Sequence, residues 1–265
     1  MKIIAEIGWN HCGDMNLAKE MIKAAAESGA DYAKFQTWSV SRLKSGDWDK
    51  DGRREIYTQA ELTKERHEEL ISYCKEMNIS FLSSVFSIED AKLLVDLKCN
   101  SVKIPSFESR NIELIKFCNE HFETVFMSTG TSTLEEIKYS ISFFNKATLY
   151  LMHCVSVYPG KYEIANLPKM IALKQVHNLI GYSDHIEGIE SAKIALGLGA
   201  VVIEKHFTID NNLPGRDNKF AILPNELLGL RKYINYIYDM MIDHGISYNE
   251  LEFDSRTNYA GRFNG

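Results

Sequence analysis

Hydrophobic residues along the chain follow two alternating periods. Short apolar, often β-branched runs predict buried strands, and segments with apolar residues every three to four positions predict helices. The first strand-like run is Lys2–Gly8, and Leu17, Met21 and Ile22 then share one helical face. Seven further strand-like runs follow, each preceding a helical pattern: Tyr32–Trp38, Ser80–Phe86, Ser101–Ser106, Thr124–Gly130, Ala147–Cys154, Leu179–Asp184 and Val201–Phe207.

Eight strand–helix units in succession predict one α/β domain. Alternating strands and helices indicate parallel pairing, and eight units in about 240 residues match a (β/α)8 TIM barrel. An open doubly wound sheet is the alternative, but no GxGxxG motif follows a predicted strand. We therefore expect a barrel domain over residues 1–243 and a short C-terminal tail over residues 244–265.

Composition narrows the class of protein. Of 265 residues, 45% are hydrophobic and 25% charged, which is ordinary for a globular protein. The net charge of −6 argues against partners such as nucleic acids or anionic membranes. The five cysteines include no CxxC pair, which favours reduced thiols. Glu6 interrupts the first apolar run before a signal peptide could develop, and no run could span a membrane. We expect a cytoplasmic protein.

Polar residues gather where each predicted strand ends. Active sites of TIM barrels lie at the carboxyl ends of the strands. Every predicted strand contributes polar groups there, including Glu6, Lys34, Gln36, Ser84, Lys103, Ser106, Glu108, Ser128, Ser156, Tyr158, Ser183, His185, Glu204 and His206. Because burying so many polar groups without partners is costly, the sequence predicts a polar pocket that binds a ligand.

Two histidines occupy matching positions on neighbouring predicted strands. His185 directly follows the seventh strand, and His206 lies near the end of the eighth. Two imidazoles with open positions around them suit a divalent metal that also binds substrate. The alternative is a pair of hydrogen-bonded rim histidines, and His11 and His153 also fall near the mouth. The histidines within helical patterns, such as His67, are expected to be solvated.

Lys34 and Lys103 lie within apolar strands. Lysine is almost never fully buried without a partner, so each is expected to meet an anion in the pocket. Nearby hydroxyls come from four serines: Ser84, Ser106, Ser128 and Ser183. Lysines, hydroxyls and helix N-termini together predict a cradle for phosphate and carboxylate. A Schiff-base role for Lys103 or Lys205 is the competing interpretation.

A series of motifs resembles the sialic acid synthase (N-acetylneuraminate synthase) family. The motifs run in order from about residue 2 to residue 223: "AEIGWNHCGD", "KFQTW", "FLSSVFS", "KIPSFES", "MSTG", "LMHCVSVYP", "GYSDHIEG", "IEKHFTID" and "PGRDNKFA". The resemblance implies a TIM-barrel enzyme that condenses phosphoenolpyruvate with an open-chain N-acetylhexosamine. It also implies phosphate release, a nonulosonic acid product, a divalent metal (Mn²⁺ or Mg²⁺) and a homodimer.

The resemblance also implies roles for individual residues. His185 and His206 correspond to the metal ligands. The implied phosphoenolpyruvate contacts are Lys34, Ser84, Lys103, Ser106, Ser128 and Ser183, with Ser156 and Tyr158 near the same ligand. Glu6, Gln36, Glu108 and Asp217 correspond to residues that face the sugar and the metal-bound water. Any of the three carboxylates is a candidate to position or deprotonate the water that attacks C2 of phosphoenolpyruvate.

Several positions depart from the family pattern. Ser156 stands where an asparagine is usual, and Pro105 and Phe107 replace common glycines. Family members also carry a C-terminal antifreeze-like domain that supplies an arginine to the partner subunit's sugar site. Only the tail stands there in this sequence, with Arg256 and Arg262 as candidate substitutes. The alternatives to a synthase are a Schiff-base lysine aldolase and a non-catalytic barrel that binds a sugar or phosphate.

Overall fold

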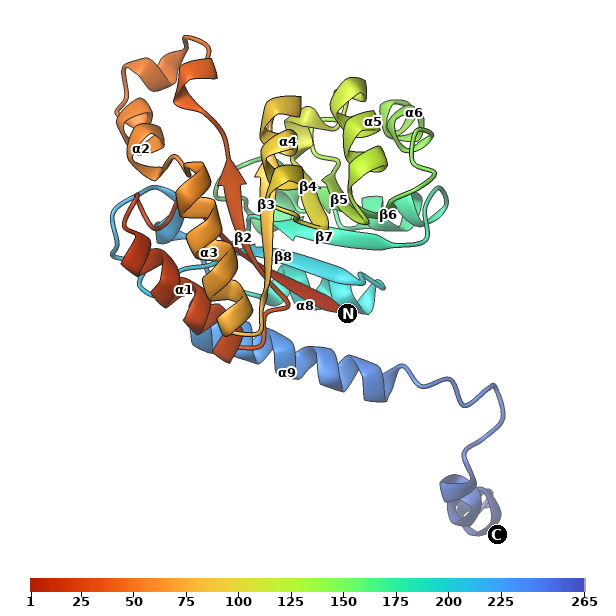
Figure 1. Cartoon of the computed structure of the whole chain (residues 1–265). Coiled ribbons are helices and arrows are strands. Elements are labelled where there is room, and N and C mark those ends of the chain that lie inside the picture. The colour runs from red at the N-terminus through yellow and green to blue at the C-terminus, as the bar shows by residue number, and fades with distance from the viewer. Residues whose placement is uncertain (265) are drawn as a thin grey trace.

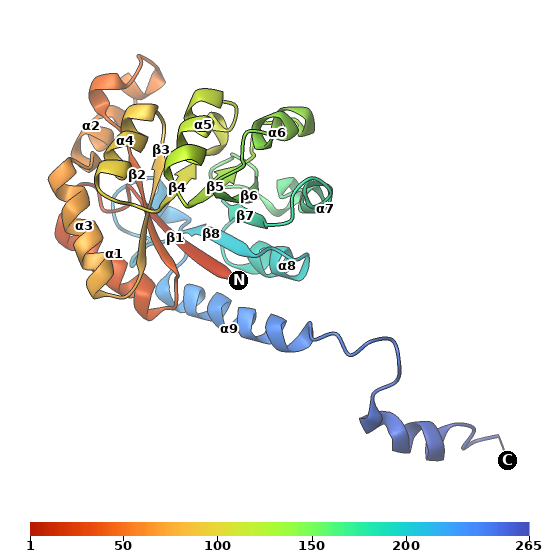
Figure 2. The same ribbon diagram turned by 45° about the vertical axis from the view of Figure 1, so that its right-hand side comes forward.

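A computed structural model describes residues 1–264 and shows a closed barrel of eight parallel strands in sequence order (Figures 1 and 2). The TIM-barrel prediction is therefore confirmed, and the open-sheet alternative is wrong. The strands are β1 (Lys2–Gly8), β2 (Tyr32–Thr37), β3 (Ser80–Val85), β4 (Ser101–Ile104), β5 (Thr124–Ser128), β6 (Thr148–Cys154), β7 (Ile180–Asp184) and β8 (Val202–His206).

One main helix follows each strand and covers the outside of the barrel (Figure 2). These helices are α1 (Met15–Glu27), α3 (Lys64–Glu76), α4 (Ile88–Asp96), α5 (Ile112–His121), α6 (Leu134–Ile141), α7 (Pro168–Lys174), α8 (Glu190–Gly197) and α9 (Pro224–Met240). Side-chain oxygens cap several N-termini, as Asp14 does for α1 and Thr63 for α3.

The connection between β2 and α3 contains an additional helix that the sequence pattern did not predict. This helix, α2 (Arg53–Ala60), follows two short 3₁₀ turns, Val40–Arg42 and Asp47–Asp49. Only Ala60 of α2 is buried, so the helix lacks the apolar stripe that reveals a helix in a sequence. It stands above the barrel at the carboxyl ends of the strands (Figure 1).

Two hydrophobic layers hold the barrel together. Outward-facing residues of the strands pack against the helices in one large core. A smaller cluster of Ile4, Tyr32, Leu82, Phe126, Met152 and Val202 fills the inside of the barrel. A Cβ on Gly181 would lie 2.3 Å from Cγ1 of Val202, so only glycine allows β7 to approach here. Apolar side chains therefore fill the barrel below the carboxyl ends of the strands, and polar side chains lie above them.

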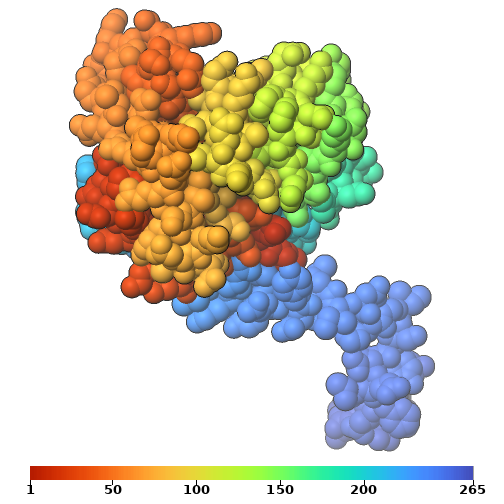
Figure 3. Space-filling model, in the orientation of Figure 1, coloured from red at the N-terminus to blue at the C-terminus, as the bar shows by residue number. Residues whose placement is uncertain are grey.

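The chain continues beyond α9 as a tail that lies away from the barrel (Figures 1 and 3). All residues from 238 to 264 are exposed. The guanidinium groups of Arg256 and Arg262 lie over the tail's own rings of Tyr248 and Tyr259. Neither arginine lines the cavity of its own chain. None of the helices within residues 1–264 has the length and apolar character needed to cross a membrane.

Candidate active site

The carboxyl ends of the strands surround a cavity of about 620 Å³. Its walls include every site residue proposed from the sequence except one: Glu6, Lys34, Gln36, Ser84, Lys103, Ser106, Glu108, Ser128, Tyr158, Ser183, His185, His206 and Asp217. The exception is Ser156, whose Oγ lies 3.8 Å from Sγ of Cys154, a residue that does line the cavity. The structure therefore brings together residues from all eight strands and the loops that follow them.

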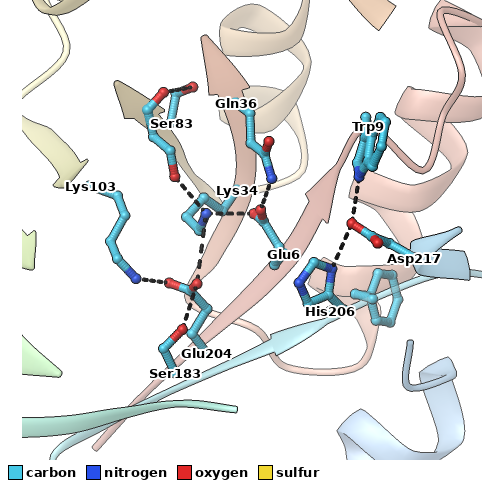
Figure 4. A network of polar contacts seen from close by, with 12 residues as sticks. Glu6, Trp9, Lys34, Gln36, Ser83, Lys103, Ser183, Glu204, His206 and Asp217 are labelled. Carbon is cyan, nitrogen blue, oxygen red and sulfur yellow. Dashed lines mark hydrogen bonds and ion pairs between the residues drawn. The ribbon is translucent and has the colours of Figure 1, made fainter. Parts of the chain in front are cut away.

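Two lysines and two glutamates form a buried charge network at the floor of the cavity (Figure 4). Lys34 Nζ lies 2.7 Å from Glu6 Oε2 and 3.8 Å from Glu204 Oε1. Lys103 Nζ lies 2.6 Å from Glu204 Oε2. Ser183 donates a 3.2 Å hydrogen bond to Glu204, so this carboxylate joins both lysines to β7. The network is electrically balanced, with two ammonium and two carboxylate groups.

Burial and pairing shift the pKa values of this network in different directions. Burial opposes ionisation of Glu204, but Lys103 and Lys34 outweigh it and lower the pKa of Glu204 to about 2. Burial raises the pKa of Glu6 and lowers that of Lys103, and their partners only partly offset these effects. Glu204 therefore remains ionised, whereas the raised pKa of Glu6 makes this carboxylate easier to protonate.

The ionised Glu204 predicts a specific acid dependence of stability. Because its pKa lies below the unfolded value of 4.5, its contribution is complete above that pH and is lost as pH falls toward about 2. We expect the difference in free energy of unfolding between the wild type and Glu204→Gln to shrink by about 2 kcal/mol from pH 6 to pH 3. Urea unfolding at several pH values measures it. A difference that is flat with pH would contradict the assignment.

Four serines line the same cavity as the lysines. Ser84 accepts a 2.9 Å hydrogen bond from Lys34, and Ser106 accepts one of 3.1 Å from the backbone N–H of Gly130. The hydroxyl of Ser128 is buried without a hydrogen-bond partner among the described residues. A buried hydroxyl that lacks a partner is costly, so Ser128 is positioned to bind a ligand oxygen.

His185 and His206 come from adjacent strands, and their ring centroids lie 5.4 Å apart. Nδ1 of His185 lies 3.1 Å from the carbonyl oxygen of Val155, which it approaches as a donor, so in the neutral ring Nε2 carries the lone pair. Burial, followed by the charges of His185 and Lys34, lowers the pKa of His206 well below its ordinary value. The neutral His206 has a buried Nδ1 without a hydrogen-bond partner in the described chain.

These two imidazoles fit a divalent metal with an incomplete set of protein ligands. Neutral nitrogens with free lone pairs are what such a metal requires. Within residues 1–264, no group of three His, Cys, Asp or Glu side chains is arranged to hold a metal alone. The nearest carboxylate oxygen, Oδ2 of Asp217, lies 3.7 Å from His206 Nδ1. Water and substrate oxygens would have to complete the coordination.

Cys154 lies beside one of these histidines. Its Sγ is 3.8 Å from Nδ1 of His185. Burial lowers the pKa of His185, but the negative charge of an ionised Cys154 and its hydrogen bond outweigh burial and raise this pKa. A metal would therefore compete with a proton at His185, which makes metal binding weaker in acid.

The remaining carboxylates lie higher in the cavity wall. Asp217 accepts a hydrogen bond from the indole N–H of Trp9, and burial raises its pKa (Figure 4). Glu108 accepts a 2.9 Å hydrogen bond from the side-chain amide of Asn111. Asp217 thus faces the histidines, whereas Glu108 lies on the opposite side, after β4.

Comparison with known proteins assigns the barrel to a family. The model of the NeuB family matches residues 21–245. The chain belongs to the NeuB family. It is 38% identical over 258 residues to N,N'-diacetyllegionaminic acid synthase of Campylobacter jejuni, which covers 91% of this chain and 77% of that protein. It is 36% identical over 236 residues to pseudaminic acid synthase of Helicobacter pylori, covering 83% and 69%.

A solved NeuB-type structure has the same fold. It is the N-acetylneuraminic acid (sialic acid) synthetase of Leptospira borgpetersenii in complex with citrate. The TM-score is 0.88 at 31% identity, covering 99% of this chain and 92% of that one. The resemblance to sialic acid synthases is confirmed. Relatives named as synthases of N,N'-diacetyllegionaminic acid, pseudaminic acid and N-acetylneuraminate 9-phosphate place this chain among nonulosonic acid synthases.

Sequence reasoning missed several residues of the NeuB site. Glu204 stood in the polar end of the eighth strand but was assigned no role, because its partners lie on β2 and β4. Three arginines and several aromatic residues also line the cavity, and many of them come from the unpredicted segment between β2 and α3. No apolar periodicity marks that segment in the sequence. Its contribution to the cavity becomes visible only from its position above the strand ends.

Two expectations about individual residues are wrong. Lys205 points outward from β8 and lines no part of the cavity, so it has no access to a substrate there. His67 is fully buried rather than solvated, and its ring contacts the hydroxyl of Thr37 at 2.8 Å and the carbonyl of Thr63 at 2.9 Å. Both residues support the fold from outside the barrel wall.

Proposed function

We propose that this chain condenses phosphoenolpyruvate with an open-chain N-acetylhexosamine and releases phosphate, in a reaction that depends on a divalent metal. The observation that carries the proposal is the pair of buried lysines, Lys34 and Lys103, which line one cavity together with four serines. The names of the relatives support a nonulosonic acid as the product.

The floor of the cavity suits a small, highly charged anion. Lys34 and Lys103 offer ammonium groups, and Ser128 offers a buried hydroxyl without a partner. Such groups, held in place before the reaction, stabilise developing charge without reorganisation. Because Glu6 and Glu204 already balance the lysines, phosphate and carboxylate together need further positive charge. A divalent ion at His185 and His206 fits this requirement.

When bound, the metal would act as a Lewis acid toward the aldehyde oxygen of the sugar. C3 of phosphoenolpyruvate attacks the aldehyde carbon, positive charge develops at C2, and water adds at C2. The phosphate then leaves by cleavage of its C–O bond. We propose that Glu6 is the general base that deprotonates this water. Glu6 lies beside Lys34, and its raised pKa suits this role. Asp217, next to His206, is placed to bind a sugar hydroxyl.

Phosphate release tests the proposal directly. Purified protein is incubated with phosphoenolpyruvate, Mn²⁺ and a panel of N-acetylated hexosamines, with and without EDTA. We expect release that requires both the metal and one class of sugar. A protein that binds phosphoenolpyruvate but releases no phosphate with any sugar would instead be a binding barrel. Sedimentation of the same sample tests the homodimer that belongs to this proposal.

Gly130 provides a test of the phosphate cradle. A Cβ at this position would lie 2.4 Å from Ser156 Oγ and 2.7 Å from Ser106 Oγ. Gly130→Ala should therefore displace Ser106 and raise KM for phosphoenolpyruvate about tenfold, as expected for one lost hydrogen bond. Gly197→Ala on α8, where a Cβ meets nothing within 4 Å, is the control. Equal KM values for the two variants would argue against the cradle.

A Schiff-base aldolase is the second candidate, and one observation favours it. Burial lowers the pKa of Lys103, as a nucleophilic amine requires. Lys103 Nζ is nevertheless held 2.6 Å from Glu204, which favours the charged ammonium. Borohydride treatment in the presence of phosphoenolpyruvate and sugar separates the two functions. A covalent adduct on Lys103, with activity that resists EDTA, would support the aldolase.

A further inference from the structure

A buried polar network lies behind β7 and β8, on the outer face of the barrel wall. Nζ of Lys205 lies 3.0 Å from Oδ2 of Asp184 and also donates to the backbone carbonyl of Ile186. The hydroxyl of Ser191 on α8 donates a 2.6 Å hydrogen bond to the same Oδ2, and Oδ1 of Asp184 accepts one of 2.9 Å from the N–H of Ile186. None of these four residues lines the cavity, so the network has no contact with a substrate there.

Stability alone does not account for this network. Asp184, Ser191 and Lys205 are almost completely buried. Moving a charge pair into a protein interior costs a desolvation free energy that the attraction often only just offsets, so well-packed apolar residues are commonly as stabilising. All four contacts of the network end on Asp184 or Ile186, the residues on either side of His185. The network is therefore placed to fix the backbone at His185.

Strand pairing holds the two candidate metal ligands differently. His206 lies within β8 and is paired with β1. His185 comes after the last residue of β7, since the pairing of β7 with β8 ends at Asp184 and Lys205. Beyond that point, the backbone carbonyl of His185 accepts a 2.9 Å hydrogen bond from the N–H of Gly160. The outer network gives His185 the further anchorage that strand pairing gives to His206.

We propose that Asp184, Ser191 and Lys205 are positioning residues that raise the affinity of the two-histidine site for a divalent metal. They do so by holding the backbone of His185 in place before the metal binds. A ligand that is already ordered loses less conformational freedom on binding, and groups outside the coordination shell commonly change metal affinity by about tenfold or more. This inference rests on the metal dependence of the proposed condensation and adds a determinant of metal binding that lies outside the cavity.

The double variant Lys205→Met/Asp184→Asn tests the inference, because it removes both charges and leaves neither unpaired. Binding of Mn²⁺ is followed by the electron paramagnetic resonance signal of the free ion, and the thermal midpoint is measured on the same samples. Ser191→Ala is the second variant. It removes one hydroxyl, keeps the charge pair and reaches His185 through Asp184. Lys193→Met, which breaks a pair near the surface of α8, is the control.

The double variant should keep a thermal midpoint close to that of the wild type and bind Mn²⁺ about tenfold more weakly. Ser191→Ala should fold and weaken Mn²⁺ binding about twofold to threefold, because one of several contacts is lost, and Lys193→Met should leave the affinity unchanged. Wild-type affinity for Mn²⁺ in the double variant would overturn the inference. Should that variant not fold, wild-type affinity in Ser191→Ala would overturn it instead.

Phosphate release separates this inference from the proposed condensation. Because the network acts through the metal, excess Mn²⁺ should restore the kcat of the double variant, with KM for phosphoenolpyruvate unchanged. A kcat that stays low at saturating Mn²⁺ would indicate a general distortion of the site and contradict the inference. Weakened Mn²⁺ binding in both variants, with no phosphate release by any of the proteins, would support the inference while refuting the condensation. A wild type that binds no Mn²⁺ would refute both.

Discussion

His206→Ala is expected to reduce phosphate release by about a thousandfold, since Lewis-acid stabilisation is worth several kcal/mol. The imidazole of His206 is neutral and buried, and its Nδ1 has no other partner among the described residues. Alanine cannot replace this nitrogen, and His185 alone would bind a divalent ion weakly. The variant should fold, because the removed ring faces the cavity and not the core.

Two readouts accompany this measurement. Mn²⁺ binding, followed by the electron paramagnetic resonance signal of the free ion, should weaken in His206→Ala, whereas the thermal midpoint should change little. His121→Ala, an exposed histidine at the end of α5, is the matched control and should retain both activity and binding. Full activity of His206→Ala after removal of metal would show that the two-histidine site has no role in the reaction.

Lys205→Met is expected to lower the free energy of unfolding by about 3–5 kcal/mol, because it leaves a buried carboxylate without its counter-ion. Lys205 Nζ lies 3.0 Å from Asp184 Oδ2, and both side chains are almost completely buried. Lys205 also donates to the carbonyl of Ile186. The ammonium group thus holds the residues on both sides of His185, from the outer face of the barrel.

Removing both charges tests whether the loss of stability comes from the unpaired carboxylate of Asp184. The double variant Lys205→Met/Asp184→Asn has no unpaired charge and should recover most of the lost stability. Lys193→Met provides the control, since its pair with Glu190 on α8 is near the surface and should contribute less than about 1 kcal/mol. Urea unfolding measures all three variants. A loss below about 1 kcal/mol in Lys205→Met would contradict the buried-pair account.

The sequence alone determined the architecture and most of the proposed site residues that the structure finds lining the cavity. Strand and helix periods differ, so eight alternations predicted the barrel, and the rule that barrel sites lie at strand carboxyl ends selected residues such as Lys34, Lys103 and His185. The motifs predicted the family that the comparison confirms. These features are local in the chain, because each depends on one strand and the few residues that follow it.

Only the tertiary structure decided which residues meet. Alternation along β8 requires Lys205 and His206 to face opposite sides, but closure of the barrel decides that His206 faces the cavity. Glu204 pairs with two lysines because β2 and β4 bring Lys34 and Lys103 to it across the barrel. The stacked rings of Trp9 and Tyr57 likewise come from separate segments, one of them a helix without an apolar stripe. Such contacts depend on which side chains of distant segments face one another in the closed barrel, and no local sequence pattern specifies those pairings.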